Sequence, residues 1–225
     1  MPDRYRRALR LISALLRSAV DAGLGRERGI DVSKDTSPPV IVTLTSYPPR
    51  FSGLHLVLST LLRQSRRPSR IVLWLSNDDV ARRPLPRRVQ RLQTRGVTII
   101  QVSENFRSYK KLIHALEKWP EAILVTADDD VLYPRDWLEG ILSAHQEHPE
   151  SVAAYRCNYM IKDGPRSLAP YATWPHAQER GPSANLFPTG SGGILYPPGS
   201  LSSEVTDREA FMKLCPAADD VWFKA

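Results

Sequence analysis

Cysteine is scarce in this sequence of 225 residues, which contains only Cys157 and Cys215. Their separation matches neither a zinc-ligand spacing nor a redox pair, and they give no sign of a disulfide framework. This argues against the disulfide-stapled secreted domains and the structural zinc proteins. A reducing cytosol is the simplest compartment, so we expect a cytoplasmic protein.

The sequence also lacks an uninterrupted hydrophobic run that could cross a membrane. Residues 1–30 have a basic amphipathic helical pattern, but Arg10 and Arg17 interrupt its apolar face, and no secretory signal core or cleavage site is present. Such a helix can lie on an anionic membrane, here peripherally on the inner face, or pack on its own domain, and both interpretations stay open. Residues 31–38 have the composition of a linker.

Acidic residues are few in two segments where arginine is concentrated. Of the formal charge of +7, residues 1–30 contribute +4 and residues 63–95 contribute +8, so the remainder is negative. These segments contain few aromatic residues, which is atypical of a nucleic-acid binder, and we expect no nucleic-acid partner. Because the charge is regional, a membrane surface or a bound phosphate explains it at least as well as a nucleic acid does. The hydrophobic content of 42% is ordinary for a globular domain, which we place at residues 39–225.

A phosphate-binding glycine loop of the Walker type is also missing. The glycine-rich segment 189–193 lacks the Lys-Ser/Thr ending, and an apolar strand at 194–196 follows it instead of a helix. Its glycines can permit close approach to a ligand or can only make a turn.

Buried strands and amphipathic helices alternate along most of the chain. The patterns predict strands at 39–45, 71–76, 97–102, 122–127 and 152–159, and helices at 54–64, 85–95, 108–119 and 134–148. This alternation predicts an α/β fold with a Rossmann-like, mostly parallel central sheet flanked by helices on both faces. Residues 162–188 break the alternation and read as a long loop, in which Tyr171 and Trp174 either stack on a sugar or anchor the loop.

Three consecutive acids, Asp128, Asp129 and Asp130, close the strand at 122–127. Because side chains alternate along a strand, Asp128 and Asp130 are expected on one side. Three neighbouring carboxylates repel one another unless a cation neutralises them, and hard oxygen ligands suit Mg²⁺ or Mn²⁺. The alternative is a polar turn in which one acid caps the helix that starts near Pro134.

Two lysines and two further acids stand at predicted helix starts. If Ser108 is an N-cap, Lys110 and Lys111 fall in the first helical turn, where positive charge is unfavourable unless an anion is near. They are either diphosphate contacts or solvated lysines. Asp219 and Asp220 open the last predicted helix, and Asp219 can also be only its N-cap.

Five segments in this order resemble the nucleotide-diphospho-sugar glycosyltransferases of the GT-A type, and more narrowly a bacterial group within them. They are residues 43–47 (TLTSY), 108–112 (SYKKL), 126–131 (TADDDV), 190–198 (GSGGILYPP) and 219–224 (DDVWFK). Related chains continue past the last of these segments, so the resemblance implies that this sequence is truncated at the C-terminus.

The resemblance implies a role for each matched position. The donor site would comprise Thr45, Ser46, Tyr47, Arg50, Asn77, Asp78, Lys110, Lys111, Asp128, Asp129, Gly192 and Gly193. Asp130 would bind the Mn²⁺ or Mg²⁺ ion most directly, with Asp128 beside it. Asp219 or Asp220 would reach the acceptor, with Asp220 as the candidate base.

The implied activity is metal-dependent transfer of a sugar from a nucleoside diphosphate, with a UDP-sugar favoured, to a hydroxyl of a glycan or glycolipid. The resemblance and the basic residues 1–30 suggest a cell-envelope polysaccharide or glycolipid as acceptor. The acidic pair favours inversion, although retention stays open. A nucleotidyltransferase would carry a glycine-rich basic loop after the first strand, where this chain has residues 46–50 (SYPPR). A non-catalytic basic binding protein is the other alternative.

Overall fold

The computed structural model describes residues 29–30, 38–165, 167–178 and 181–225. The expected helix of residues 1–30 and the linker of residues 31–38 lie almost entirely outside the described residues, so both stay predictions. Within the described ranges, no helix has the length and apolarity needed to span a bilayer.

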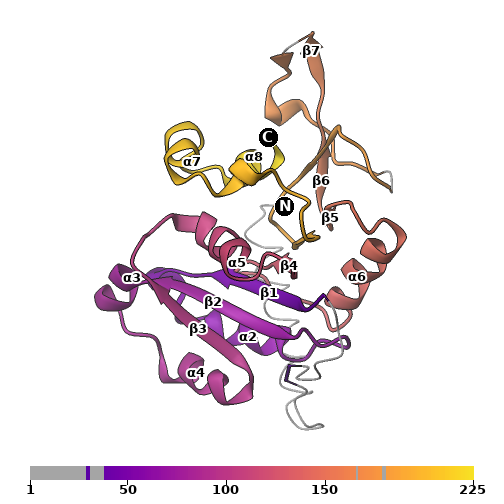
Figure 1. Cartoon of the computed structure of the whole chain (residues 1–225). Coiled ribbons are helices and arrows are strands. Elements are labelled where there is room, and N and C mark those ends of the chain that lie inside the picture. The colour runs from indigo at the N-terminus through magenta and orange to yellow at the C-terminus, as the bar shows by residue number, and fades with distance from the viewer. Residues whose placement is uncertain (1–28, 31–37, 166, 179–180) are drawn as a thin grey trace, which may run out of the picture.

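A six-stranded sheet forms the centre of the molecule (Figure 1). Four parallel strands, β1 (Val40–Thr45), β2 (Arg70–Ser76), β3 (Val97–Val102) and β4 (Ile123–Thr126), lie in the order β3-β2-β1-β4. Next to β4 lie β10 (Ile194–Tyr196) and the edge strand β5 (Ala153–Ala154), and β10 runs antiparallel to both. The strand order reverses direction at β1 and β4, where open α/β sheets bind ligands.

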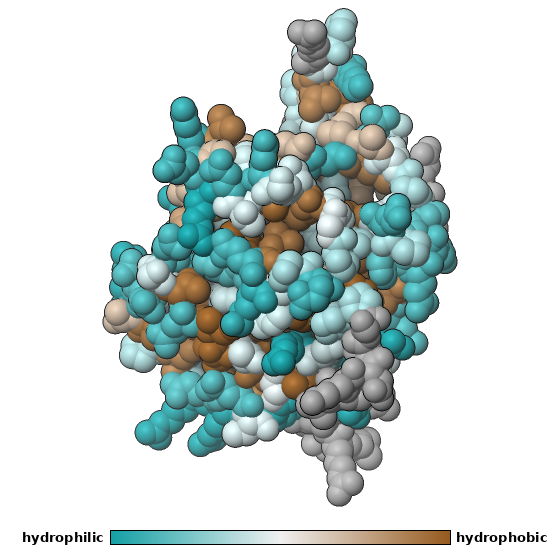
Figure 2. Space-filling view, in the orientation of Figure 1, coloured by the Kyte–Doolittle hydropathy of each residue, from teal (hydrophilic) through white to brown (hydrophobic). Residues whose placement is uncertain are grey.

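Helices cover both faces of the sheet because successive strand residues point to opposite sides. Val42 packs toward α2 (Leu54–Leu61), α4 (Arg87–Gln90) and α6 (Trp137–Glu147). Ile41 packs toward the 3₁₀ turn η3 (Arg107–Lys111) and toward α5 (Ile113–Lys118), α7 (Arg208–Leu214) and α8 (Asp219–Lys224). The expected mostly parallel sheet flanked by helices is confirmed. Figure 2 shows hydrophilic residues over most of the visible face, with hydrophobic residues in smaller groups between them.

The spacing of leucines explains why α2 forms and which side it buries. Leu54, Val57, Leu58 and Leu61 recur at helical spacing and are all buried against the sheet. Each buried aliphatic side chain of this size contributes about 1.5 to 3 kcal/mol.

The segment after α6 differs from its prediction. The strand expected at 152–159 is broken at Tyr155, so β5 joins the main sheet while β6 (Cys157–Tyr159) pairs with β9 (Leu186–Pro188). The expected loop at 162–188 also contains β7 (Lys162–Gly164) and β8 (Ser167–Leu168), which pair with each other. We call β6, β7, β8 and β9 the arm, and Figure 1 shows β6 and β7 extending away from the sheet.

Aromatic packing holds the base of the arm together. The Tyr171 and Trp174 rings lie 5.3 Å apart, and both contact Phe187 on β9. The Trp174 indole donates a hydrogen bond to the Ala169 carbonyl at 2.9 Å. These contacts support the anchoring interpretation of the two aromatics.

Three other elements depart from the prediction. A helix, α3 (Asn77–Arg82), starts directly after β2 because the Ser76 hydroxyl accepts from the Asp79 N–H and caps it. The helix predicted at 85–95 divides into α4 and the 3₁₀ turn η2 (Arg91–Arg95). The helix predicted at 108–119 divides into η3 and α5, and Ser108 lies inside η3 without capping it.

Gly192 and Gly193 precede β10 and pack against Trp137 at the start of α6. Both have positive φ, at 101° and 104°. The Trp137 indole donates to the Gly192 carbonyl at 2.6 Å, and a Cβ at position 193 would lie 2.6 Å from Trp137 Cζ2. The two glycines therefore serve close packing between a strand and a helix.

We predict that Gly193→Ala destabilises the fold by about 1 to 3 kcal/mol, because the new methyl group collides with Trp137 at a backbone conformation that suits glycine. Thermal unfolding should show a lower midpoint than wild type. Gly53→Ala is the matched control, since no described residue beyond its two chain neighbours has a heavy atom within 4 Å of its Cβ position. Equal midpoints for the two variants would contradict this packing role.

Candidate functional site

A cavity of about 460 Å³ opens where β1 and β4 end. Its lining comes from the segments that follow β1, β2, β3 and β4, as expected for ligand binding at the carboxyl edge of a parallel sheet. The lining residues are Thr45, Ser46, Tyr47, Arg50, Asp79, Asn105, Arg107, Ser108, Lys110, Lys111, Ala127, Asp128 and Asp129.

Lys111 lies at the centre of this site with only 8% of its surface exposed. Its amine is 3.4 Å from Asp128 Oδ1 and 3.4 Å from Asp219 Oδ2. Burial lowers the pKa of the Lys111 amine, but the surrounding carboxylates outweigh burial, so the net pKa is raised and the amine stays charged. Lys111 therefore links the end of β4 to the start of α8.

The backbone of Lys111 is fixed to the sheet by a buried chain of hydrogen bonds. The Thr43 hydroxyl donates to the Lys111 carbonyl at 2.5 Å and accepts from the Trp74 indole at 2.9 Å. Thr43 and Trp74 lie on adjacent strands, so β1 and β2 together set the position of the lysine.

Lys110 points into a different cluster. Its amine is 3.1 Å from Asp79 Oδ2 and 2.8 Å from the Asn105 side-chain oxygen. Both lysines are buried at the end of a 3₁₀ turn, so the expectation of lysines in the first turn of an α-helix is wrong, as is the alternative of solvated lysines. Carboxylates balance the charges of both lysines.

Arg50 neutralises the other two acids of the triplet. Its guanidinium lies 2.5 Å from Asp129 Oδ1 and 3.1 Å from Asp130 Oδ2, and it packs over the Tyr47 ring. The second Asp129 oxygen is buried and has no hydrogen-bond partner among the described residues. The prediction from strand alternation does not apply to these acids, because β4 ends at Thr126. The capping alternative is wrong, because α6 begins at Trp137 and the residue at its N-cap is Asp136.

The carboxylate oxygens of the acidic triplet are ligands that suit a hard divalent cation. Among the described residues no group of three or more acidic, histidine or cysteine side chains is arranged to hold a metal by itself. Mg²⁺ is commonly held by one or two carboxylates, with waters and substrate phosphates supplying the rest. Burial is the main cause that raises the pKa of Asp128, and the nearby Asp130 carboxylate raises it further. The Lys111 amine opposes this rise. The carboxylates therefore suit a cation that is shared with a phosphate.

Asp220 lies beside Lys111 on the first turn of α8. Its Oδ2 accepts a hydrogen bond from the Gly190 N–H at 2.9 Å. A Cβ on Gly190 would lie 3.1 Å from the Lys111 amine and 3.3 Å from Asp220 Oδ1, so a larger residue there would press on both side chains. Burial raises the pKa of Asp220, while the Gly190 N–H opposes the rise.

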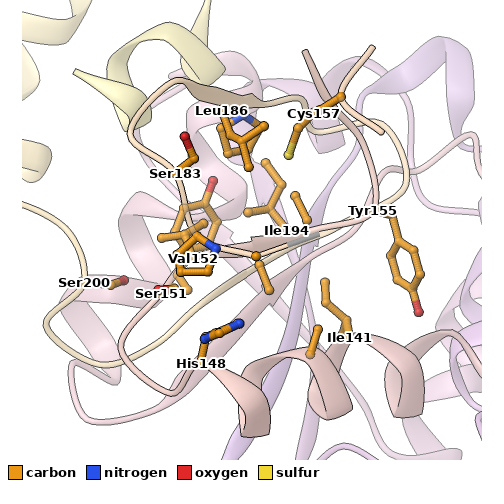
Figure 3. Close-up of a pocket in the computed structure, with 18 of the residues that line it drawn as sticks. Ile141, His148, Ser151, Val152, Tyr155, Cys157, Ser183, Leu186, Ile194 and Ser200 are labelled. Atoms are coloured by element: carbon orange, nitrogen blue, oxygen red, sulfur yellow. The ribbon is translucent and has the colours of Figure 1, made fainter. Parts of the chain in front are cut away.

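A second, larger cavity of about 940 Å³ (Figure 3) has Asp220 among its lining residues. Its lining residues come from α6, β5, β10, α8 and the arm strands β6 and β9, and from the segments between them. Its apolar lining includes Ile141, Val152, Leu186 and Ile194, and its hydroxyl groups include Ser151, Ser183 and Ser200.

The structure brings together most of the residues expected in the donor site. The exceptions are Asn77 and Asp78, which are exposed and lie outside the cavity lining, and the glycines Gly192 and Gly193. Asp79 takes the place expected for Asn77 or Asp78. Sequence reasoning also missed Asn105, Arg107 and Gly190, although Asn105 and Arg107 follow the third strand and could have been found by the strand-end rule.

The sequence profile described as glycosyl transferase family 2 matches residues 40–195. No curated protein sequence matches this chain significantly. Among solved structures, residues 1–349 of S. aureus TarS match with 17% identity and a TM-score of 0.52, over 82% of this chain and 53% of that chain. The same protein in complex with UDP matches with 15% identity and a TM-score of 0.54, over 82% of this chain and 54% of that chain.

A mannosyltransferase, PcManGT from Pyrobaculum calidifontis in complex with GDP-Man and Mn²⁺, is 20% identical with a TM-score of 0.38, over 60% of this chain and 40% of that chain. This chain spans about half the length of the TarS chains that it matches. At these identities the TarS structures support the fold alone. Because the family profile extends from β1 into β10, over more than half of the chain, the chain belongs to glycosyl transferase family 2 and has the GT-A fold.

Proposed function

We propose that this chain is a metal-dependent glycosyltransferase that moves a sugar from a nucleoside diphosphate, with a UDP-sugar favoured, to a hydroxyl of a glycan or glycolipid, with inversion. The observation that carries the proposal is the position of Lys111 between Asp128 and Asp219. This one amine connects a cavity suited to a nucleotide with an acidic helix start suited to an acceptor.

The cavity at the end of β1 has groups that suit a nucleoside. Tyr47 is 46% exposed at its edge and offers an aromatic face. The Ser46 hydroxyl lines the cavity and is buried with no hydrogen-bond partner among the described residues. A buried hydroxyl without a partner is costly, and a polar group of a base or ribose would satisfy it.

The departing diphosphate needs positive charge at the triplet. A divalent cation held by Asp130 and Asp128 would supply electrostatic stabilisation of the leaving group. Lys111 and Arg50 each add a positive charge in the cavity that Asp128 lines.

Asp220 is the best candidate for the base that inversion requires. The Gly190 N–H fixes its carboxylate, and burial raises its pKa toward the range useful for proton transfer. Asp220 lines the second cavity and not the donor cavity, so an acceptor hydroxyl bound in the second cavity would lie beside this carboxylate.

Calorimetric titration of UDP and GDP, with and without Mn²⁺, tests the donor side. We predict that wild type binds the nucleoside diphosphate in a metal-dependent way. Asp130→Ala should bind it roughly tenfold or more weakly in the presence of Mn²⁺, because the variant loses an oxygen ligand for the metal. Asp78→Ala removes an exposed carboxylate outside the cavity and should bind like wild type. A wild-type protein that binds no nucleoside diphosphate in a metal-dependent way would refute the proposed function.

The raised pKa of Asp220 also affects stability. Above the ordinary carboxyl pKa of about 4, the unfolded chain releases this proton more readily than the folded chain. The contribution of Asp220 to the free energy of unfolding is therefore fully present below that pKa. It is lost as the pH rises through the raised pKa of the folded state. Charged Asp220 costs stability at neutral pH.

For Asp220→Asn we therefore predict opposite effects on activity and stability. The turnover number should fall by roughly 100-fold to 10,000-fold, because the base is lost. The unfolding midpoint at neutral pH should rise, since asparagine keeps an acceptor for the Gly190 N–H without the buried charge, and the difference should vanish near pH 4. Unchanged turnover would exclude Asp220 as the base.

Ala144→Trp tests the acceptor side. Ala144 is an exposed residue of α6 that lines the second cavity, so a large ring there should obstruct it. We predict an increase of roughly tenfold or more in the acceptor KM, with donor hydrolysis unchanged. Gln146→Trp places the same ring on the opposite side of the helix and is the control. If both variants behave alike, the acceptor does not use this cavity.

A further inference from the structure

The three adjacent acids are neutralised from two directions. Asp128 faces the Lys111 amine, while Asp129 and Asp130 share the guanidinium of Arg50. Asp129 is 6% exposed, and the Arg50 guanidinium lies against its Oδ1. Arg50 thus holds a position between two carboxylates that a divalent cation would also approach.

A guanidinium and a divalent cation cannot share these oxygens without repulsion. The two cations would meet at distances of a few ångströms, where like charges in a partly buried site repel strongly. A metal that takes Asp129 or Asp130 must therefore displace Arg50 from them. The displaced guanidinium then needs another anion, because Arg50 is charged at all physiological pH values.

We propose that Arg50 is a built-in counter-ion that competes with the divalent cation, so that the metal binds tightly only together with a nucleoside diphosphate. The inference rests on the proposed function for its choice of ligand. Arg50 lines the same cavity as Lys111 and Asp128, so a diphosphate bound there offers the displaced guanidinium a new partner. Metal and nucleotide affinities are then linked, and each strengthens the other by the same factor.

Two simpler roles for Arg50 give different results. If Arg50 only stabilises the fold, its removal lowers the unfolding midpoint and leaves Mn²⁺ affinity unchanged. If Arg50 only contacts the donor, its removal weakens UDP binding and again leaves the affinity for Mn²⁺ alone unchanged. Competition alone predicts that removing Arg50 tightens Mn²⁺ binding without nucleotide.

The test is a Mn²⁺ titration of the full chain, followed by the paramagnetic resonance signal of free Mn²⁺, with and without UDP. Without UDP, Arg50→Gln should bind Mn²⁺ roughly tenfold or more tightly than wild type. The factor by which UDP strengthens Mn²⁺ binding should be smaller in Arg50→Gln than in wild type. Arg50→Lys should lie between them, because the variant keeps the positive charge but loses the rigid fork of guanidinium donors that pairs with both carboxylates.

Arg83→Gln is the matched control for loss of one positive charge. Arg83 donates a hydrogen bond at 3.3 Å to the carbonyl of Pro48, which lies in the same 3₁₀ turn as Arg50. Arg83→Gln should bind Mn²⁺ like wild type. Equal Mn²⁺ affinity of wild type and Arg50→Gln would overturn the inference, as would equal tightening in Arg83→Gln. If Arg50→Gln does not fold, the comparison of Arg50→Lys with wild type decides in the same way.

The outcomes separate this inference from the proposed function. A wild-type protein that shows no effect of UDP on Mn²⁺ binding argues against the proposed function. The change in affinity for Mn²⁺ alone between wild type and Arg50→Gln still decides whether Arg50 is the competitor.

Discussion

The site depends on keeping the charged amine of Lys111 buried. Such a group is tolerated only where carboxylates surround it, and here they come from two distant parts of the chain, Asp128 after β4 and Asp219 on α8. The Thr43 and Trp74 hydrogen bonds fix the lysine backbone to two strands. The sheet therefore determines where α8 can place its acids, and the donor and acceptor sides become parts of one electrostatic unit.

The strands were the most predictable part of the fold. Runs such as residues 40–45 are apolar on both faces and end at prolines or acids, so their position follows from burial alone. The arm was not predictable, because the short pairings of β6 with β9 and of β7 with β8 depend on contacts between residues far apart in sequence. The hydroxyl of Tyr155, at the break between β5 and β6, donates to the Trp137 carbonyl, a contact that a period-two pattern does not contain.

The positions at strand ends gave most of the donor cavity, whereas the partners of each side chain could not be derived from the sequence. Asp79 and not Asp78 faces the cavity because the Ser76 cap starts a helix immediately and sets its rotation. The glycines show the same limit. The sequence marks 190, 192 and 193 equally, but only the structure separates Gly190, which lies against Lys111 and Asp220, from Gly193, which packs on Trp137.

The balance of charges explains why a metal and a nucleotide should arrive together. Six carboxylates face four cations around the site, namely Asp79, Asp128, Asp129, Asp130, Asp219 and Asp220 against Arg50, Arg107, Lys110 and Lys111. With all of these groups ionised, the region carries a net negative charge and repels a diphosphate at the range where salt screening is weak. A divalent cation removes that excess, yet by itself it must displace Arg50. The cation neutralises the negative charge that repels the diphosphate, and the diphosphate offers the displaced Arg50 guanidinium a new partner. Their joint binding is therefore favoured over the binding of either one alone.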